Sequence, residues 1–272
     1  SQTKEVLEGN SDEVIAELLA LNGSSAGARP KALIGVDKER KNISFGAHQL
    51  SDGFEPWMVK FPNSQDGNDS GAIEYVYALM ATEAGIAMPN VHLFSSQKGN
   101  GYFAVKRFDR EGNKRLHMHT VSGLIHSNFR FPSLDYEDLL SLTSYLTKDI
   151  REVEKMFRLA VFNVMAHNQD DHAKNFSFLM NELGEWKLSP AYDLTFSNGP
   201  GGEQSTMVLG EGRNITVKHL SKLGEEAQLS KEFIENVIEQ TLSALGKWQS
   251  LSKKYGVSDV NMQLISKTIS KF

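Results

Sequence analysis

The sequence lacks cysteine entirely over its 272 residues. This absence excludes disulfide bonds, cysteine-ligated zinc and iron–sulfur clusters. The sequence also lacks any uninterrupted apolar run approaching ~18 residues, so we expect no membrane-spanning helix and no membrane partner. The first residues, Ser-Gln-Thr-Lys-Glu, contain no apolar signal-peptide core, so we expect no secretory leader at this end. These absences favour a cytoplasmic protein.

An excess of positive charge is missing as well, because 29 Lys and Arg residues stand against 34 Asp and Glu residues, a formal net charge of −5. Non-specific nucleic-acid binding depends on Lys and Arg neutralising phosphates, so we expect no direct nucleic-acid ligand. The hydrophobic content, by contrast, is 40%, which is ordinary for a globular protein with a core. At roughly 150 residues per domain, the length indicates one large domain or two lobes.

The pattern of apolar residues changes near residue 110. Before it, short runs predict mainly strands. After it, helical spacing dominates, and one segment, 151–167, is apolar nearly all round, which is typical of a buried central helix. We therefore predict an α+β fold with a strand-rich lobe over residues 1–110, a helical lobe over 111–272 and a ligand cleft between them. The predicted strands are 31–37, 42–50, 57–61, 91–96, 102–108, 176–180 and 186–188, and the predicted helices are 11–21, 72–84, 134–146, 151–167, a long one from 230 to 248 and one over about 259–269.

The loop from His167 to Asn175 reads His-Asn-Gln-Asp-Asp-His-Ala-Lys-Asn, and Asp193 follows it beyond a predicted hairpin. Phosphotransferases of the protein-kinase type need one carboxylate to accept the proton of the substrate hydroxyl. They also need an Asn and a second Asp to hold Mg²⁺ against the phosphates. Asp170 and Asn175 match the kinase spacing Asp-x-x-x-x-Asn, so we predict Asp170 as catalytic base and Asn175 and Asp193 as Mg²⁺ ligands. Lys174 is predicted to neutralise the transferring phosphoryl group.

The first lobe supplies the remaining parts of a kinase site. Lys60 lies in a predicted strand, where it would hold phosphate oxygens, and Glu74 on the next helix is available to pair with it. The loop Gly23-Ser-Ser-Ala-Gly-Ala28 has the small residues that let backbone N–H groups approach phosphates. The order loop, Lys, Glu, Asp, Asn, Asp is that of the kinase plan. We therefore expect a two-lobed, protein-kinase-like fold in which Lys60 meets the second-lobe side chains around Mg-ATP.

Two other functions are compatible with parts of this set. A non-catalytic nucleotide-binding interaction protein would not need the complete Lys, Asp, Asn, Asp set. A metal-dependent phosphohydrolase would bind its metal through imidazoles and carboxylates, but it would leave Lys60, Asn175 and Asp193 unexplained. A purely structural alternative is that Asp170-Asp171 only caps a turn. In the kinase interpretation, His172 belongs to the nucleotide site, where it hydrogen-bonds to hold the catalytic loop. The candidate ligands of the phosphohydrolase are His117, His119, His167, Asp170, Asp171 and His172, of which His117 and His119 are otherwise alternate residues on a strand or loop.

Five motifs in one order resemble the HipA-type serine/threonine kinases, which are toxins of bacterial toxin–antitoxin systems. The resemblance covers about residues 20–250 and implies a two-lobe kinase-like fold, Mg-ATP as phosphoryl donor and a protein hydroxyl as acceptor. The motifs are Gly-Ser-Ser-Ala-Gly-Ala-Arg-Pro-Lys31, Val-Lys60-Phe-Pro, Lys106-Arg-Phe-Asp-Arg, Asp170-Asp-His-Ala-Lys-Asn-Phe-Ser and Ser-Pro-Ala-Tyr-Asp193.

The resemblance also assigns residues that the pattern alone does not. It implies that Ser24, or else Ser25, is a site of inhibitory autophosphorylation, since a phosphate there would repel the phosphates of ATP. It implies that Lys106, Arg107 and Phe108 form the hinge that holds the adenine. The loop residues that it assigns to the nucleotide are Ala26, Gly27, Ala28, Arg29 and Lys31.

Partners follow from the resemblance alone. Members of this family include kinases that phosphorylate aminoacyl-tRNA synthetases, and their usual partner is a DNA-binding antitoxin. Because the candidate phosphate loop begins near residue 23, we expect this chain to lack the N-terminal subdomain of longer members. It then either resembles the compact members, whose missing piece is a separate small protein, or is a truncated chain. Arg29-Pro30 replaces a more polar pair, and Pro30 cannot donate a backbone N–H in the loop.

Overall fold

The computed structural model describes residues 2–5, 30–45, 50, 52–62, 67–96, 99–125, 134–199 and 201–272. The helix predicted over 11–21 and the small-residue loop that follows it lie outside these residues. The loop predictions that therefore have no structural account concern Ser24, Ser25, Ala26, Gly27, Ala28 and Arg29.

The chain divides into two compact units, and each is assembled from separate segments. Unit 1 comprises residues 1–76, 89–115 and 251–259, and unit 2 comprises 77–88, 116–250 and 260–272. Helix α2 (Ser70–Glu83) therefore begins in unit 1 and ends in unit 2. The sequence predicts two continuous lobes instead, and that assignment stays a prediction.

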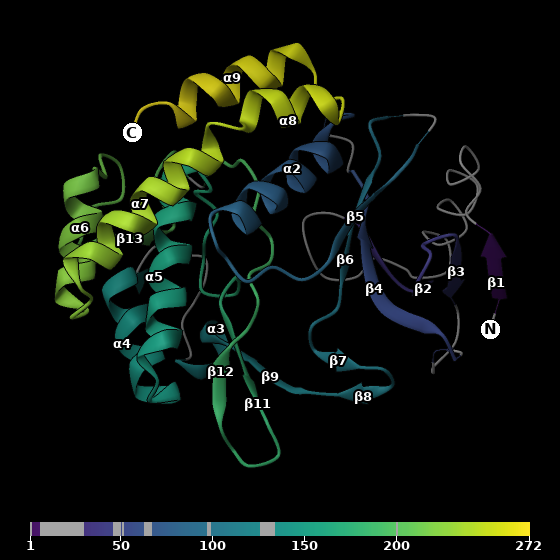
Figure 1. Ribbon diagram of the computed structural model, residues 1–272, viewed down its shortest axis with the longest axis horizontal. Helices are drawn as coiled ribbons and strands as arrows, with labels where there is room; N and C mark the ends of the chain where they lie inside the picture. Colours follow the sequence, from purple (N-terminus) through teal and green to yellow (C-terminus); the bar gives the residue numbers. More distant parts are fainter. Residues whose placement is uncertain are drawn as a thin grey trace. The chain divides into compact units, whose positions relative to one another are not determined.

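Unit 1 is built on a six-stranded sheet with the order β1-β3-β2-β4-β6-β5, in which every neighbouring pair is antiparallel (Figure 1). In β2 the side chains of Ala32, Ile34 and Val36 are buried, whereas that of Leu33 is 52% exposed. Such alternation is expected when one face of a strand covers a core and the other meets solvent. The strands are β1 (Gln2–Glu5), β2 (Lys31–Asp37), β3 (Asn42–Phe45), β4 (Phe54–Lys60), β5 (Val91–Phe94) and β6 (Tyr102–Lys106).

Strand β4 begins three residues earlier than predicted, because Pro56 does not interrupt it. Pro56 pairs with Gly35 of β2, and the ladder to β6 starts only at Trp57. The missing N–H of the proline is therefore not required by β6, while its carbonyl still accepts a hydrogen bond of 2.8 Å from the backbone N–H of Arg107.

The first turns of α2 pack closely against the chain that leads into β6. A Cβ atom on Gly71 would overlap the backbone carbonyl oxygen of Gly101, so glycine is required at this approach. Asp69, which is 3% exposed, accepts hydrogen bonds from the backbone N–H and hydroxyl of Ser258 at 2.8 and 2.6 Å. These contacts attach the segment 251–259 to unit 1.

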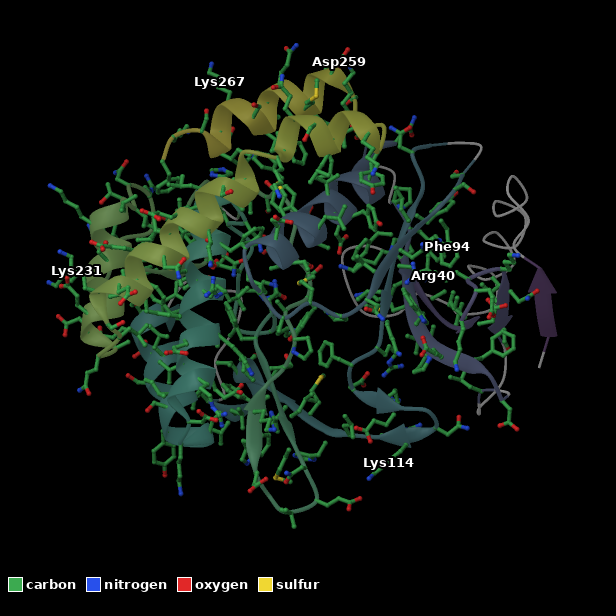
Figure 2. The ribbon with its side chains drawn as sticks, in the orientation of Figure 1. Arg40, Phe94, Lys114, Lys231, Asp259 and Lys267 are labelled. Carbon is green, nitrogen blue, oxygen red and sulfur yellow. The ribbon has the colours of Figure 1, made fainter. Side chains whose placement is uncertain are left out.

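Unit 2 is mainly helical, and α4 and α5 lie side by side in it (Figure 1). Asp135, Asp149 and Ser230 each accept a backbone N–H hydrogen bond as the N-cap residue of a helix. Helix α5 is buried nearly all round, as predicted. Figure 2 shows Asp259 and Lys267 at opposite ends of α9, where each charge complements the helix dipole. The helices beyond α2 are α3 (Val121–Leu124), α4 (Tyr136–Thr147), α5 (Ile150–Met165), α6 (Val217–Glu226), α7 (Lys231–Leu245), α8 (Trp248–Lys254) and α9 (Asp259–Ile269).

The single long helix predicted from 230 to 248 is wrong, because it is split into α7 and α8 at Gly246 and Lys247. Glycine has a high conformational entropy and a low helix propensity, so the chain turns there although the apolar spacing continues to Trp248. Within the described parts of the chain, no helix is long and apolar enough to cross a bilayer.

The predicted hairpin of unit 2 forms, and β9 (His117–Thr120) pairs with it as a third strand, in a segment that was predicted only as a strand or loop. The sheet has the order β12-β11-β9, with antiparallel neighbours. Two further pairs of short strands occur: β10 is parallel to β13 in unit 2, and β7 and β8 form a hairpin in unit 1, on which Lys114 lies (Figure 2). The strands are β7 (Arg110–Glu111), β8 (Lys114–Arg115), β9 (His117–Thr120), β10 (Leu134–Asp135), β11 (Ser177–Met180), β12 (Trp186–Leu188) and β13 (Thr206–Met207).

Candidate active site

A sharp turn at the end of α5 presents the loop that carries the predicted base. His167 has a φ of 56°, a left-handed conformation that is unfavourable for a residue with a Cβ. Its Nε2 lies 3.1 Å from Oδ1 of Asn198, and its ring stacks on Phe196 with centroids 5.2 Å apart. These contacts offset the cost of the backbone conformation and fix the direction in which the loop leaves the helix.

Within this loop, Asp170 and Asn175 are held together. The Nδ2 of Asn175 donates to the backbone carbonyl of Asp170 at 2.7 Å, and its N–H donates to the carbonyl of His172 at 2.8 Å. The Asp170 side chain is 53% exposed, and its Oδ1 lies 3.9 Å from Nε2 of His172. The spacing of five residues thus closes a turn that leaves the carboxylate accessible to a substrate.

Asp193 acts electrostatically on Asp170. Burial raises the pKa of the Asp170 carboxyl, His172 opposes the rise, and the negative charge of Asp193 adds to it. The charge of Asp193 therefore acts on Asp170, although 23 positions separate them in the sequence. A raised pKa makes a carboxylate a better proton acceptor. Asp193 itself has a φ of 60°, which turns the chain at the point where the side chain is exposed.

Tyr192 fixes the approach to Asp193, a role that the sequence reasoning missed. Its hydroxyl donates to the backbone carbonyl of Lys174 at 2.7 Å and accepts from the hydroxyl of Ser177. Burial raises the pKa of Tyr192 to about 12, so the hydroxyl stays protonated and remains a donor. Since Tyr192 precedes Asp193 and bonds the residue before Asn175, it ties the two predicted Mg²⁺ ligands to one framework.

Asp171 is neither an exposed turn cap nor a metal ligand. It is fully buried, and its carboxylate accepts hydrogen bonds from Tyr136, Gln204 and the backbone of Thr206. Of the histidines in the phosphohydrolase interpretation, His117 packs edge-on against Trp186. No group of three or more metal-binding side chains occurs among the described residues.

Unit 1 contains the predicted Lys–Glu ion pair. Nζ of Lys60, at the end of β4, lies 2.5 Å from Oε1 of Glu74 on α2. Their side chains are only 11% and 3% exposed, and the ammonium group lies 5.7 Å from the centre of the Phe103 ring. Low exposure makes this pair costly to break, because removal of one partner leaves a buried, uncompensated charge. The ion pair therefore fixes the ammonium group in place.

The other unit 1 residues that were predicted to bind nucleotide and that the structure describes lie on the same sheet or just after it. Lys31 stands directly across from Lys60 in the β2–β4 register. Lys106 pairs with Glu55 at 2.7 Å, and Phe108 lies in the turn that follows β6. The guanidinium group of Arg107 binds both carboxylate oxygens of Asp109, at 2.9 and 2.8 Å. Their hinge role stays a prediction, as does the meeting of Lys60 with Asp170, since the two belong to different units.

These features define a mixed α/β protein. It has a buried ion pair between Lys60 on an antiparallel sheet and Glu74 on α2. Asp170 and Asn175 lie on one loop, and Asp193 follows the β11–β12 hairpin. The chain belongs to the HipA-like C-terminal domain family, whose model matches residues 23–248.

Two curated relatives come from Sinorhizobium fredii (strain NBRC 101917 / NGR234). “Putative kinase Y4dM” is 26% identical over 191 residues, which are 65% of this chain and 44% of that protein. “Putative kinase Y4mE” is 27% identical over 105 residues, 35% of this chain and 25% of that protein. The chain thus spans less than half the length of the curated relatives it matches.

Two solved structures share the fold. The HipA toxin of Shewanella oneidensis MR-1, solved with HipB and its operator DNA, matches with a TM-score of 0.67 and 16% identity, covering 99% of this chain and 70% of that one. The Helicobacter pylori proinflammatory kinase CtkA matches with a TM-score of 0.58 and 14% identity, covering 82% of this chain and 87% of that one. At these identities the likeness is one of fold.

Proposed function

We propose that this chain is an ATP- and Mg²⁺-dependent serine/threonine protein kinase of HipA type, with the two-lobed kinase architecture. The observation that carries the proposal is the loop in which Asn175 holds the backbone of Asp170 while burial, with a smaller contribution from the charge of Asp193, raises the pKa of the Asp170 carboxyl. A half-exposed carboxylate with a raised pKa is suited to orient a substrate hydroxyl and accept its proton. Membership of the HipA-like family supports the same reaction.

The oxygen donors beside Asp170 suit a hard divalent cation. Asn175 uses Nδ2 on the Asp170 carbonyl, so Oδ1 is its ligand atom, and Asp193 offers an exposed carboxylate. Carboxylate and amide oxygens are the protein ligands that Mg²⁺ takes. When bound, Mg²⁺ would neutralise charge on the phosphates of ATP. Lys174, which is exposed on the same loop, would neutralise the transferring phosphoryl group.

Unit 1 would bind the nucleotide. Lys60, oriented by Glu74, would donate to phosphate oxygens. Lys31 and the preceding loop residues 26–29 would contact the phosphates through their backbone, and Lys106 to Phe108 would hold the adenine. Ser24, or else Ser25, would be the autophosphorylation site that limits ATP binding. His172 would support the loop beside the nucleotide.

The biological setting follows from relatives. The Shewanella HipA structure contains HipB and operator DNA, so we propose a DNA-binding antitoxin as partner and a cytoplasmic toxin role. The acceptor would be a translation-related protein such as an aminoacyl-tRNA synthetase, whose phosphorylation arrests growth.

The test is phosphoryl transfer itself. The protein is incubated with MgCl₂ and γ-labelled ATP, and label incorporation is followed by intact mass and peptide mapping. We expect autophosphorylation at Ser24 or Ser25, and its loss in Asp170→Ala with unchanged circular dichroism. Nucleotide binding without transfer would reject the kinase and favour a non-catalytic binding protein. Comparing phosphoproteomes of cells expressing the intact chain and the Asp170→Ala variant would identify the acceptor.

A further inference from the structure

Two stretches that follow Asp193, residues 197–199 and 204–206, hold the catalytic loop and are here called the clamp. Gln169, directly before Asp170, donates its N–H to the carbonyl of Ser197 at 3.1 Å. The carbonyl of Gln169 accepts from both the N–H and the hydroxyl of Ser205, at 3.0 and 2.7 Å. A Cβ on Gly199 would lie 2.7 Å from that same carbonyl oxygen, so the approach demands glycine. The backbone of Gln169 is thus fixed from both sides.

The other side of Asp170 is fixed by Asp171, whose carboxylate lies at the centre of the clamp. Its Oδ1 accepts the backbone N–H of Thr206 at 3.0 Å, and its Oδ2 accepts Nε2 of Gln204 at 2.8 Å and the hydroxyl of Tyr136. The hydroxyl of Thr206 donates to the backbone carbonyl of Asp171. All these partners donate, so they match an acceptor at position 171.

A second layer sets the direction of the tyrosine hydroxyl. Asn163 on α5 donates from Nδ2 to the Tyr136 oxygen at 3.0 Å. Its Oδ1 accepts from Nδ2 of Asn168 at 2.9 Å. Since Tyr136 accepts from Asn163, its own proton is directed to Asp171. The network therefore joins α4, α5, the catalytic loop and the clamp through buried groups. Among these groups the Oδ1 of Asn168 has no hydrogen-bond partner in the described part of the chain, whereas the oxygens of Asp171 and Tyr136 are all hydrogen-bonded.

The positions of the hydrogen-bond acceptor and its donors are the reverse of those in regulated protein kinases. There, the segment after the Mg²⁺-binding Asp is ordered when it is phosphorylated and the phosphate pairs with Arg side chains. Here the hydrogen-bond acceptor is the Asp171 carboxyl on the catalytic loop, and two of its donors, Gln204 and Thr206, are on the clamp. The residue before Asp170 is the uncharged Gln169. The hydroxyls of Ser205 and Thr206 are buried and already donate to backbone carbonyls of the loop.

We propose that Asp171 is a positioning residue that holds Asp170 in its working place at all times, so that the clamp needs no phosphorylation. The proposal rests on the proposed kinase function. Asp171 does not touch the reacting atoms; it acts through the backbone of the loop. Loss of its acceptor should therefore lower kcat and leave the KM for ATP nearly unchanged.

The first experiment compares Asp171→Asn with the wild-type protein. Asparagine has nearly the shape of aspartate, but its amide N–H₂ group would face one of the hydrogen-bond donors that now bind the Asp171 carboxylate. We expect kcat to fall by roughly 10²-fold, the loss that a misplacement of about 1 Å can cause, with the KM for ATP within about twofold. The control is Asp138→Asn on α4, the same substitution at an exposed position, which should leave kcat unchanged. Tyr136→Phe and Thr206→Val each remove one donor and should give intermediate losses, which keeps the test valid if Asp171→Asn does not fold.

A second readout separates this proposal from the kinase proposal. Hydrogen exchange of the Thr206 amide, which donates to Asp171, should accelerate at least tenfold in Asp171→Asn and stay slow in Asp138→Asn. A wild-type protein that transfers no phosphate would contradict the kinase function. Unchanged exchange of the Thr206 amide in Asp171→Asn would instead contradict the proposal that Asp171 holds the clamp. An unchanged kcat in Asp171→Asn would overturn the positioning role. Peptide mapping of active protein should find no phosphate on Ser205 or Thr206, and activity that depends on phosphate there would also overturn the proposal.

Discussion

The Nδ2 atom of Asn175 donates a hydrogen bond to the backbone carbonyl of Asp170, 2.7 Å away. One side chain is therefore assigned two tasks: its nitrogen shapes the loop that presents the proposed base, and its oxygen is the proposed ligand of a cation. The spacing of five residues between an Asp and an Asn follows from this geometry, because both groups must belong to one closed turn.

This double role predicts the effect of replacing Asn175. Asn175→Asp keeps an oxygen ligand but removes the donor and places a negative charge against the Asp170 carbonyl. We expect phosphoryl transfer to fall by roughly 10²-fold or more, the range for lost positioning, measured with γ-labelled ATP. Asn214→Asp, at an exposed position before α6, is the matched control and should retain full transfer. Normal transfer in Asn175→Asp would contradict the role of its amide nitrogen.

We predict that a Glu→Gln change lowers the unfolding free energy more in the Lys60–Glu74 pair than in the Glu55–Lys106 pair. Glu74→Gln leaves the ammonium group of Lys60 buried without its partner and should cost roughly 3 kcal/mol of unfolding free energy. Glu55→Gln breaks the pair with Lys106, whose side chains are 32% and 35% exposed, and should cost at most about 1 kcal/mol. Urea unfolding followed by circular dichroism measures both. Equal losses would show that burial does not distinguish the pairs.

Two glycines predict opposite effects of alanine. Gly71→Ala places a Cβ against the Gly101 carbonyl oxygen and should destabilise the protein by about 1–3 kcal/mol, as overpacking does. Gly246 ends α7 in a right-handed conformation with φ −59°, and its Cβ would meet nothing closer than 3.4 Å. Gly246→Ala should therefore stabilise by about 0.5 kcal/mol, because it restricts the unfolded chain. Thermal unfolding of both variants tests the contrast, and a stabilised Gly71→Ala would refute the close approach.

Asp171 predicts a pH dependence of stability. Burial raises the pKa of its carboxyl from 3.8 to about 7 in the folded protein, although its three donors oppose the rise. Between these values the folded state binds the extra proton, so the contribution of the group to stability is largest below pH ~4 and is lost as pH rises to about 7. The wild-type protein should lose up to roughly 4 kcal/mol relative to Asp171→Asn over this range. Urea unfolding of both proteins from pH 4 to 8 measures the difference, which a constant gap would contradict.

Local patterns predicted most elements of the fold, and the reasons for the exceptions are physical. The β11–β12 hairpin and α5 carry strong periodicity and formed as expected. Strands β10 and β13 are two residues long and pair across the sequence, so no local alternation marks them. Helix α6 was missed because its capping box uses His219 at the position where Glu or Gln is the familiar signal.

In the candidate site, too, local spacing was predictable from the sequence and contacts between distant segments were not. Spacing alone suggested Asp170 with Asn175, because both lie in one short loop. The partners of Asp171 could not be predicted in this way, since Tyr136 and Thr206 each lie 35 residues from it. A buried carboxylate is indistinguishable in the sequence from an exposed one until the donors around it are known. The role of Tyr192 was hidden for a similar reason, as its hydroxyl reaches back 18 residues to Lys174.

Helix α2 begins in one compact unit and ends in the other, and this limits where the chain can be divided into fragments. Tyr77, in the second half of the helix, is fully buried and donates its hydroxyl proton to Ala166, and Arg158 binds the carbonyl of Ala84 where the helix ends. A fragment truncated at residue 110 would carry Tyr77 and Ala84 without Ala166 and Arg158, to which they are hydrogen-bonded. Such a fragment would expose a large aromatic ring and aggregate, so expression trials should keep α2 and α5 in the same polypeptide.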